Sequence, residues 1–183
     1  MKKYAFIENV PGLSVENYMD SFDDGEWISH IAGFDGIDAC MDYAKKLIAE
    51  GYEMLNFCGD FGPEHVAELM ENAPEGTIVR YAAYLPEEQK KLEALPKYDN
   101  YGMIIFGGVE EPVRIELSAP EMDTHTVFIK DVDQAVEVAR ELTAAGVDGI
   151  ELCGSFDEDM TKRIIEEVCK VNPKTPVGSN GLS

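Results

Sequence analysis

The sequence has 183 residues, of which 45% are apolar, the ordinary share for a chain that folds around a packed core. Its 15 basic and 36 acidic residues give a formal charge of −21, which repels phosphate backbones and anionic lipids, so nucleic acid and membranes are poor partners. The longest apolar run, residues 101–109, is far shorter than the ~20 residues that span a bilayer. Met1-Lys2-Lys3 leads directly into a strand pattern without a signal peptide, and we therefore expect a cytoplasmic protein.

Apolar runs that end at proline or glycine predict the strands of the first half, and apolar residues three and four positions apart predict its helices. The strands cover residues 3–9, 27–34, 54–58 and 77–84. The helices cover residues 14–22 and 36–50, a segment that begins at Pro63, and residues 86–95. The last of these is strongly charged and joins the two halves.

The second half predicts strands over residues 101–106, 124–129, 149–153 and 176–177. A helix over residues 131–145 has Asp131 as its N-cap and Gln134 three residues later. The last helix follows a capping-box pattern, Ser155-Phe-Asp-Glu158. Residues 113–117 alternate like an extra strand where the first half has a helix, so we expect the symmetry of the halves to lapse there.

The chain contains an internal duplication, in which a strand ending in Cys-Gly-x-Phe appears twice. The two copies are Tyr52-Glu-Met-Leu-Asn-Phe-Cys-Gly-Asp-Phe61 and Val147-Asp-Gly-Ile-Glu-Leu-Cys-Gly-Ser-Phe156. Residues 36–71 align with residues 131–166 at an offset of 95 with nine identities, where chance would give roughly two or three. His30 and His125 share this offset.

The predicted strands begin about every 25 residues, which fits a strand, a crossover helix and two short loops. Eight such units predict a small α/β fold that resembles a (βα)8 barrel, built from (βα)4 repeats at residues 1–96 and 97–183 and packed as one domain. Two ferredoxin-like halves, or doubly wound α/β halves, are the competing arrangements.

At Ala5-Phe-Ile7, Val10-Pro-Gly12 and the two Cys-Gly-x-Phe segments, the chain resembles a family of short bacterial proteins known only as a domain of unknown function. Members of that family are about as long as one copy here. This chain departs from the pattern by fusing two copies, and its second copy lacks the proline-glycine turn. The resemblance implies kinship of fold and assigns no catalytic residue.

Ligand sites of parallel α/β folds lie at the carboxyl ends of the strands, which here are expected to share one rim. The candidate catalytic residues selected in this way are His30, Cys58, Asp60, His125 and Cys153. The candidate ligand-binding residues are Glu8, Gly59, Arg80, Gly154, Ser155, Ser179 and Asn180.

The cysteines and histidines at matching positions of the two halves admit three interpretations. A zinc site suits the residue types, but neither Cys–His pair completes a tetrahedral set alone, so we assign no metal. A thiol nucleophile is the second interpretation, because a helix N-terminus lowers a thiol pKa and a histidine could act as base. The third is a buried cysteine beside a hydrogen-bonded histidine. Since the four cysteines, Cys40, Cys58, Cys153 and Cys169, form no Cys-x-x-Cys pair, we expect reduced thiols.

The sequence therefore favours a small-molecule-binding protein, with a lyase, isomerase or hydrolase activity as the enzymatic hypothesis. A non-catalytic binding or assembly module is the alternative. No cofactor follows from the sequence, and a homo-oligomer remains compatible with it.

Overall fold

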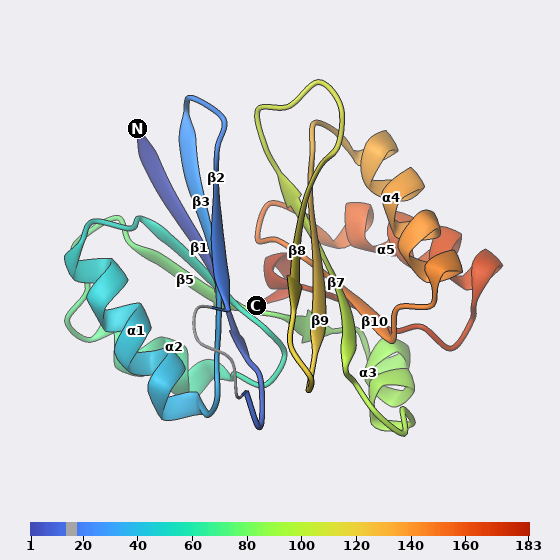
Figure 1. Cartoon of the computed structure of the whole chain (residues 1–183), viewed down its shortest axis with the longest axis horizontal. Helices are drawn as coiled ribbons and strands as arrows, with labels where there is room; N and C mark the ends of the chain where they lie inside the picture. Colours follow the sequence, from blue (N-terminus) through green and yellow to red (C-terminus); the bar gives the residue numbers. More distant parts are fainter. Residues whose placement is uncertain (14–17) are drawn as a thin grey trace.

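The computed structural model describes residues 1–13 and 18–183 and has four layers, in which two β-sheets pack face to face between outer helices (Figure 1). Helices α1 (Ile37–Ala49) and α2 (Pro63–Met70) cover one sheet. Helices α4 (Val132–Ala145) and α5 (Glu158–Val171) cover the other sheet on the opposite side of the molecule. The inner faces of the two sheets therefore bury each other.

The first sheet has five strands in the order β2-β3-β1-β4-β5. They are β1 (Lys2–Asn9), β2 (Met19–Asp23), β3 (Trp27–Phe34), β4 (Met54–Phe57) and β5 (Ile78–Tyr81). Strands β3, β1, β4 and β5 run parallel, and β2 pairs with β3 as an antiparallel edge.

The second sheet repeats this topology in the order β8-β9-β7-β10-β11, with β6 added at its edge. Its strands are β6 (Ala83–Tyr84), β7 (Asn100–Phe106), β8 (Val113–Ser118), β9 (Asp123–Ile129), β10 (Gly149–Leu152) and β11 (Val177–Ser179). Helix α3 (Pro86–Glu93) leads from β6 into the second half, and the 3-10 helix η1 (Asn180–Leu182) follows β11.

The predicted closed barrel does not form, because each half makes its own open sheet. The predicted helix over residues 14–22 is also wrong where the chain is described, since Met19–Asp23 is strand β2, while residues 14–17 lie outside the described residues. Strand β8 occupies the equivalent place in the second half, so the symmetry that was expected to lapse is kept. The antiparallel hairpin strands β2 and β8 each end a parallel sheet, which prevents its continuation into a barrel.

Capping explains where the helices of the second half begin. Asp131 is the N-cap of α4 and accepts a hydrogen bond from the Gln134 backbone N–H at 2.9 Å, as predicted. Helix α5 begins two residues later than the predicted capping box, whose first residue is Ser155. Its N-cap is Asp157, which accepts from the Met160 N–H at 2.8 Å.

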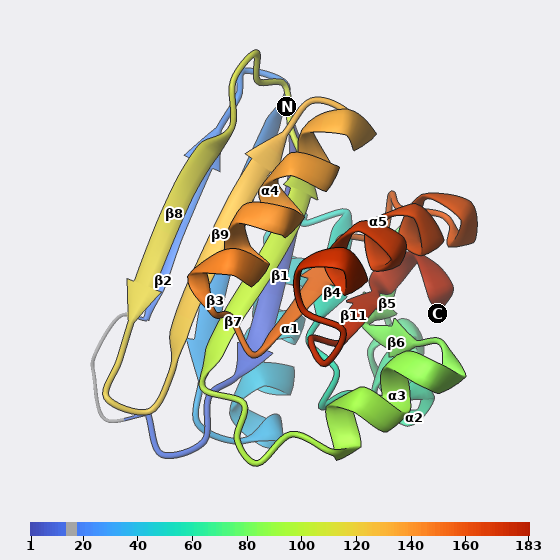
Figure 2. The ribbon, with the colours of Figure 1, turned by 90° about the vertical axis from the view of Figure 1, so that its right-hand side faces the viewer.

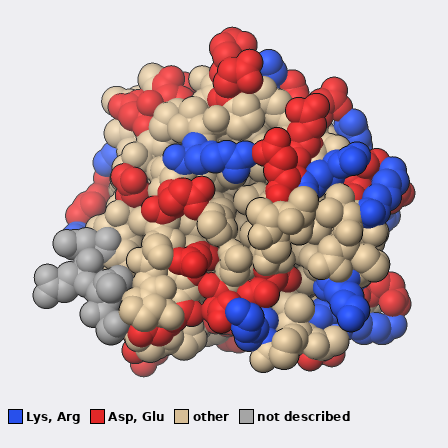
Figure 3. Space-filling model, turned by 45° about the vertical axis from the view of Figure 1, so that its right-hand side comes forward, with Lys and Arg blue, Asp and Glu red and all other residues tan. Residues whose placement is uncertain are grey.

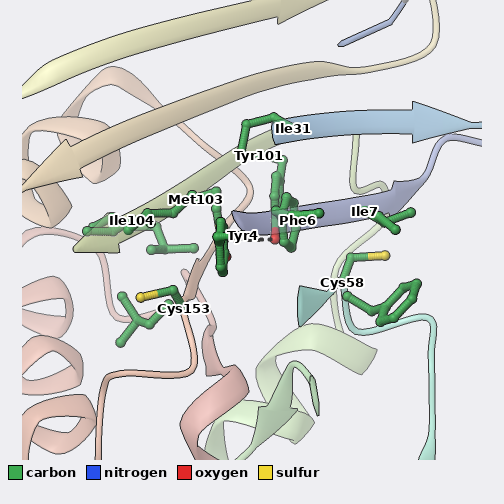
Figure 4. Close-up of a cluster of buried hydrophobic side chains, with 14 of the residues drawn as sticks. Tyr4, Phe6, Ile7, Ile31, Cys58, Tyr101, Met103, Ile104 and Cys153 are labelled. Carbon is green, nitrogen blue, oxygen red and sulfur yellow. Dashed lines mark hydrogen bonds between the residues drawn. The ribbon is translucent and has the colours of Figure 1, made fainter. Parts of the chain in front are cut away.

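Strands β1 and β7 lie on either side of the interface between the sheets and run in opposite directions (Figure 2). Both are buried on their two faces, which is why each reads as a nearly continuous apolar run. Phe6 of β1 stacks on Tyr101 of β7 with ring centroids 6.1 Å apart. As a result, the carboxyl end of β1 lies beside the amino end of β7, and the two Cys-Gly-x-Phe tips, marked by Cys58 and Cys153, lie at opposite ends of the core (Figure 4).

Acidic side chains are spread over the surface and interleaved with lysine and arginine on the face shown in Figure 3. Many of them form exposed ion pairs, such as Lys45 with Glu68 and Arg140 with Glu167. None of the helices within residues 1–13 and 18–183 combines the length and the apolar character needed to cross a membrane.

Candidate functional site

A cavity of about 290 Å³ lies between the sheets at the carboxyl end of β1. Both halves of the chain and the connection between them contribute to its wall. The lining residues are Glu8, Asn9, Pro11, Cys58, Gly59, Asp60, Tyr84, Leu92, Tyr98, Tyr101, Met122 and Glu151. We call this the acidic cavity, because it contains three carboxyl groups, two of which are buried.

Glu8 stands near the end of β1 and is only 1% exposed. Its Oε2 accepts a hydrogen bond of 2.9 Å from the Thr124 hydroxyl, which itself accepts from the Tyr18 hydroxyl at 2.8 Å. Its Oε1 has no hydrogen-bond partner among the described residues. The pKa of Glu8 is raised to about 8, mainly by burial. The Thr124 hydrogen bond opposes this rise, and the nearby Glu151 carboxylate adds to it. At neutral pH Glu8 is therefore mainly a protonated acid.

Glu151 lies in the middle of β10 and is also 1% exposed. It accepts more hydrogen bonds from protein donors than Glu8 does. Its Oε1 accepts from the Gly59 backbone N–H at 2.9 Å and from the Tyr84 hydroxyl at 2.6 Å. Its Oε2 accepts from the Tyr101 hydroxyl. Burial raises the pKa of Glu151 to about 7, while these three donors favour the charged form and oppose the rise.

The loop of Cys58 and Asp60 is held by Asn9 at the end of β1. The Asn9 backbone N–H donates to the Cys58 sulfur at 3.4 Å, and its side chain donates to Asp60 at 2.8 Å. Asn9 also accepts from the Gly36 N–H at 2.9 Å, which ties this loop to the start of α1. Burial, followed by the charges of Glu151 and Asp60, raises the pKa of Cys58 well above its ordinary value, so this thiol stays protonated.

Two glycines leave room for the tyrosine rings that line the acidic cavity. A Cβ at Gly149 would lie 2.5 Å from the Tyr98 ring, and a Cβ at Gly178 would lie 2.6 Å from the Tyr84 ring. Tyr98 then packs edge-on against Tyr101, with ring centroids 5.6 Å apart. Burial raises the pKa of all three tyrosines well above the ordinary value, so they stay protonated. The Tyr84 and Tyr101 hydroxyls donate to Glu151, and the Tyr98 hydroxyl has no hydrogen-bond partner among the described residues.

A second, smaller cavity of about 130 Å³ lies at the opposite end of the interface. It is lined by Tyr4, Trp27, Ser29, Met54, Ile105, Phe106, Cys153 and Ser155. When the strand registers of the two halves are compared, several of these residues occupy the positions that correspond to acidic-cavity residues. The pairs are Glu8/Ile105, Asn9/Phe106, Cys58/Cys153, Asp60/Ser155, Tyr101/Tyr4 and Met122/Trp27. We call this the neutral cavity, because each carboxyl group has an uncharged counterpart.

The buried carboxyl of Glu151 also has a neutral counterpart, Asn56 of β4. Asn56 Oδ1 accepts from the Tyr4 hydroxyl at 3.1 Å and from the Gly154 N–H at 2.8 Å. These bonds repeat the contacts of Glu151 with Tyr101 and Gly59. The same local architecture therefore holds an amide at one end of the molecule and a carboxyl group at the other.

The two candidate histidines, His30 and His125, lie outside both cavities. Their contacts are with edge strands and neighbouring elements. His30 contacts Ser21 of β2 and Tyr43 of α1, each at 2.8 Å. His125 contacts Glu116 of β8 and, at 2.9 Å, Asn100 of β7. No histidine is among the described residues that line either cavity, so neither cysteine has the base that the thiol hypothesis required.

The structure brings together Glu8, Cys58, Gly59 and Asp60 of the predicted site in the acidic cavity. Cys153 and Ser155 line the neutral cavity, so the single rim does not exist. The other four predicted residues hold the fold together. Arg80 donates to the Gly154 carbonyl, Ser179 donates to the Phe156 carbonyl at 3.3 Å, and Asn180 bridges the Phe57 N–H and the Leu152 carbonyl at 3.2 and 3.3 Å.

Sequence reasoning missed Glu151 and the tyrosines Tyr84, Tyr98 and Tyr101. One signal was present, because Glu151 interrupts an otherwise apolar strand between Ile150 and Leu152. A charged residue at such a position is rarely buried without a reason. The tyrosines carried no comparable signal, since their meeting depends on how the two sheets dock.

Comparison with known proteins gives a family without a function. The model of a family of unknown function, DUF6506, matches residues 2–97 and again residues 100–181, in agreement with a tandem duplication. A search of curated proteins finds no match. Among solved structures, an ABC transporter periplasmic solute binding protein from Actinobacillus succinogenes 130z with bound D-allose aligns with 97% of this chain and 77% of its own. The TM-score of 0.31 and the 11% identity do not establish a shared fold.

Proposed function

Because the chain belongs to the family of unknown function DUF6506, its activity has to be inferred from its cavities, and we propose that it binds a small polar molecule in the acidic cavity. We further propose that Glu8 and Glu151 transfer protons to and from that molecule. A cavity of about 290 Å³ is at the small end of ligand sites, so the ligand is a small metabolite.

The unpartnered Oε1 of Glu8 carries this proposal. A buried polar atom without a hydrogen-bond partner costs about 1–3 kcal/mol, and the fold does not require this one. The neutral cavity has Ile105 at the equivalent position and folds with the same strand topology. A ligand hydroxyl or amine that bonds to Glu8 Oε1 would remove the cost.

The two buried carboxyl groups differ in the number of hydrogen-bond donors that they accept from, one for Glu8 and three for Glu151. Glu8, with one donor and a pKa near 8, is the proton donor. Glu151, with three donors and a pKa near 7, is available as a carboxylate that accepts a proton. Environments that push the pKa values of two nearby carboxyl groups apart are typical of acid–base pairs.

The reaction class that fits such a pair is isomerisation or elimination. Glu151 would take a proton from a substrate carbon while Glu8 gives its proton to the substrate oxygen. In the isomerisation of a hydroxy-carbonyl compound, the neighbouring hydroxyl then gives its proton to Glu8 and becomes the new carbonyl, and Glu151 delivers its proton to the former carbonyl carbon. In an elimination, the protonated oxygen leaves as water, and solvent restores both carboxyl groups. Neither carboxyl group ends the cycle changed.

Exchange of carbon-bound protons tests this proposal. Neutral hydroxy-carbonyl compounds and amino alcohols would be incubated with the full chain in D₂O and followed by NMR. We expect deuterium incorporation into one class, with a loss of at least 10²-fold in Glu8→Gln and in Glu151→Gln. The variant Ile105→Val, at the matched place in the neutral cavity, should exchange at the wild-type rate.

A binding module without catalysis is the second candidate. The same cavity would then bind its ligand tightly enough to raise the melting temperature, and no exchange would be seen. If wild-type protein binds a compound but exchanges none of its protons, the catalytic part of the proposal is wrong and the binding part stands. If no compound shifts the melting temperature, both parts fail.

A further inference from the structure

We infer that the ligand of the acidic cavity is a small organic cation, an ammonium compound rather than a neutral polyol or an anion. This inference rests on the proposed binding function and narrows it to one chemical class. It depends on the charges, the tyrosine rings and the comparison between the two cavities.

The charges of the acidic cavity are all of one sign. Glu8, Asp60 and Glu151 line it, and no lysine, arginine or histidine is among the described lining residues. The lysines next in sequence to lining residues bond elsewhere: Lys91 pairs with Glu88 at 2.6 Å and Lys97 pairs with Asp99 at 2.7 Å. Buried charges are normally paired, because an isolated one is costly. A bound cation would supply the missing partner, whereas an anion would be repelled.

The aromatic and apolar residues that line the acidic cavity suit the carbon atoms of such a cation. Tyr98 and Tyr101 pack edge-on at 5.6 Å, and Leu92 and Met122 add apolar surface. Aromatic rings attract cations through the negative face of the ring, and this attraction grows when water is excluded. A site that combines carboxylates with tyrosines recognises an ammonium group carried on a short carbon chain.

The neutral cavity shows that this acidity is not a consequence of the fold or of the composition. Ile105, Ser155 and Asn56 stand where the acidic cavity has Glu8, Asp60 and Glu151. The acidic composition of the chain explains exposed carboxylates, but it does not explain two that are 1% exposed. The two buried carboxyl groups were therefore retained at one end only, where they serve a ligand.

A neutral polyol and an inorganic ion fit less well. A polyol could bond to Glu8 Oε1 but would leave the charges of Asp60 and Glu151 without a positive partner. The cavity of about 290 Å³ is much larger than a single metal ion. No group of three or more His, Cys, Asp or Glu side chains arranged to hold a metal occurs in the described part of the chain.

Cation binding would be linked to the release of protons. Glu8 keeps its proton near neutral pH, whereas Glu151 is only partly ionised because burial raises its pKa to about 7, and a bound cation favours the charged form of Glu151. The other titratable groups around them, besides Asp60, are Tyr18, Cys40, Cys58, Tyr84, Tyr98 and Tyr101. The pKa values of these phenols and thiols are all raised, so they remain neutral to pH 8. Affinity should therefore rise with pH through the titration of Glu151.

Isothermal titration calorimetry of the full chain tests the inference with matched probe pairs. The cations are ethanolammonium and n-butylammonium, and their neutral partners are ethylene glycol and n-butanol. We expect at least one cation to bind tenfold more tightly than its neutral partner and tenfold more tightly at pH 8 than at pH 6. The heat should depend on the ionisation enthalpy of the buffer, which reports proton release.

Three variants locate the site. Glu8→Gln and Glu151→Gln should each weaken cation binding at least tenfold. Asp60→Asn, at an exposed position where folding is not at risk, should weaken it to a smaller extent. Ile105→Val in the neutral cavity should leave it unchanged.

The outcomes separate this inference from the function on which it rests. If the neutral probes bind as tightly as the cations, in a Glu8-dependent manner and without proton release, the cation inference is overturned and the binding function stands. If neither class binds, both fail. Cation binding that survives in Asp60→Asn and Glu151→Gln alike would place it elsewhere on the acidic surface and would also overturn the inference.

Discussion

The acidic and the neutral cavity are two versions of one structure at opposite ends of the same sheet interface. Each lies beside a Cys-Gly-x-Phe tip, and in each a tyrosine hydroxyl and a tip N–H meet on one buried side chain of the facing half. That side chain is Asn56 at the end of the molecule that holds the neutral cavity's tip, Cys153-Gly154, and Glu151 in the acidic cavity. Because the backbone framework is shared, the difference between the two cavities isolates what the carboxyl groups add.

What the carboxyl groups add is a stability that depends on pH, together with the proposed reactivity. A neutral residue at either position is compatible with the fold, as the neutral cavity shows. The acidic cavity keeps two carboxyl groups with raised pKa values, which makes the folded protein sensitive to pH. Perturbed groups of this kind cluster at functional sites.

The largest expected effect comes from Glu8→Gln. The unfolded carboxyl ionises near its ordinary pKa of 4.5 and the folded one near 8, so the wild-type free energy of unfolding falls as the pH rises between these values. At about 1.4 kcal/mol for each unit of pKa, the fall is on the order of 5 kcal/mol. Urea denaturation from pH 5 to pH 9 should show Glu8→Gln gaining stability relative to wild type by several kcal/mol.

Glu75→Gln is the control for that measurement, because it removes an exposed carboxylate. Its stability relative to wild type should stay nearly constant over the same pH range. A Glu8→Gln curve parallel to that of Glu75→Gln would mean that Glu8 is ionised in the folded protein at neutral pH, and the assigned proton donor would be lost.

Copying the carboxyl group into the neutral cavity should have the next largest effect. Ile105 is 2% exposed, and no lining residue is charged. Ile105→Glu should lower the free energy of unfolding by about 3 kcal/mol at pH 8, through lost apolar burial and an unpaired polar group, and by less at pH 5, where the carboxyl is protonated. Ile105→Met, which conserves volume, should cost less than about 1.5 kcal/mol at both pH values. Equal losses at pH 5 and pH 8 for Ile105→Glu would show that the neutral cavity does not disfavour charge.

Most elements of both halves could be predicted from the sequence, because apolar periodicity and the N-cap Asp131 are local signals. The duplication was equally visible, since it rests on nine identities. The barrel prediction was wrong because a 25-residue strand spacing fits any repeated strand-helix unit. The weakly patterned segment before Trp27 contains the hairpin strand β2, whose pairing with β3 closes the edge of the sheet.

The site could be predicted only in part, for a geometric reason. Residues on one half, such as Glu8, Cys58 and Asp60, follow from the rule that ligands bind at the carboxyl ends of parallel strands. Glu151 reaches the same cavity from the middle of a strand of the other half. Its contribution follows from the opposite directions of β1 and β7, which no local pattern in the sequence records.

A smaller difference is expected between the two equivalent tyrosines. The Tyr101 hydroxyl donates to a carboxyl group, and the Tyr4 hydroxyl donates to the amide of Asn56 at 3.1 Å. Tyr101→Phe should cost about 1.5–3 kcal/mol at pH 8, where Glu151 is ionised, while Tyr4→Phe should cost about 0.5–1.5 kcal/mol at any pH. Thermal and urea unfolding at pH 5 and pH 8 would measure both, and a Tyr101→Phe cost that does not grow with pH would contradict the charged state assigned to Glu151.

The smallest effects are expected at the matched histidines. His30 and His125 occupy equivalent strand positions, and each bridges an edge strand to a neighbouring element without lining a cavity. Burial lowers the pKa of His30, so it acts as a neutral hydrogen-bonding side chain at pH 7. His30→Gln and His125→Gln should each cost about 1 kcal/mol or less. Both should leave proton exchange and cation binding at wild-type levels. A large loss of either property in His125→Gln would link the outer edge of the second sheet to the acidic cavity, and it would return the histidine to the proposed catalytic group, which otherwise consists of Glu8 and Glu151.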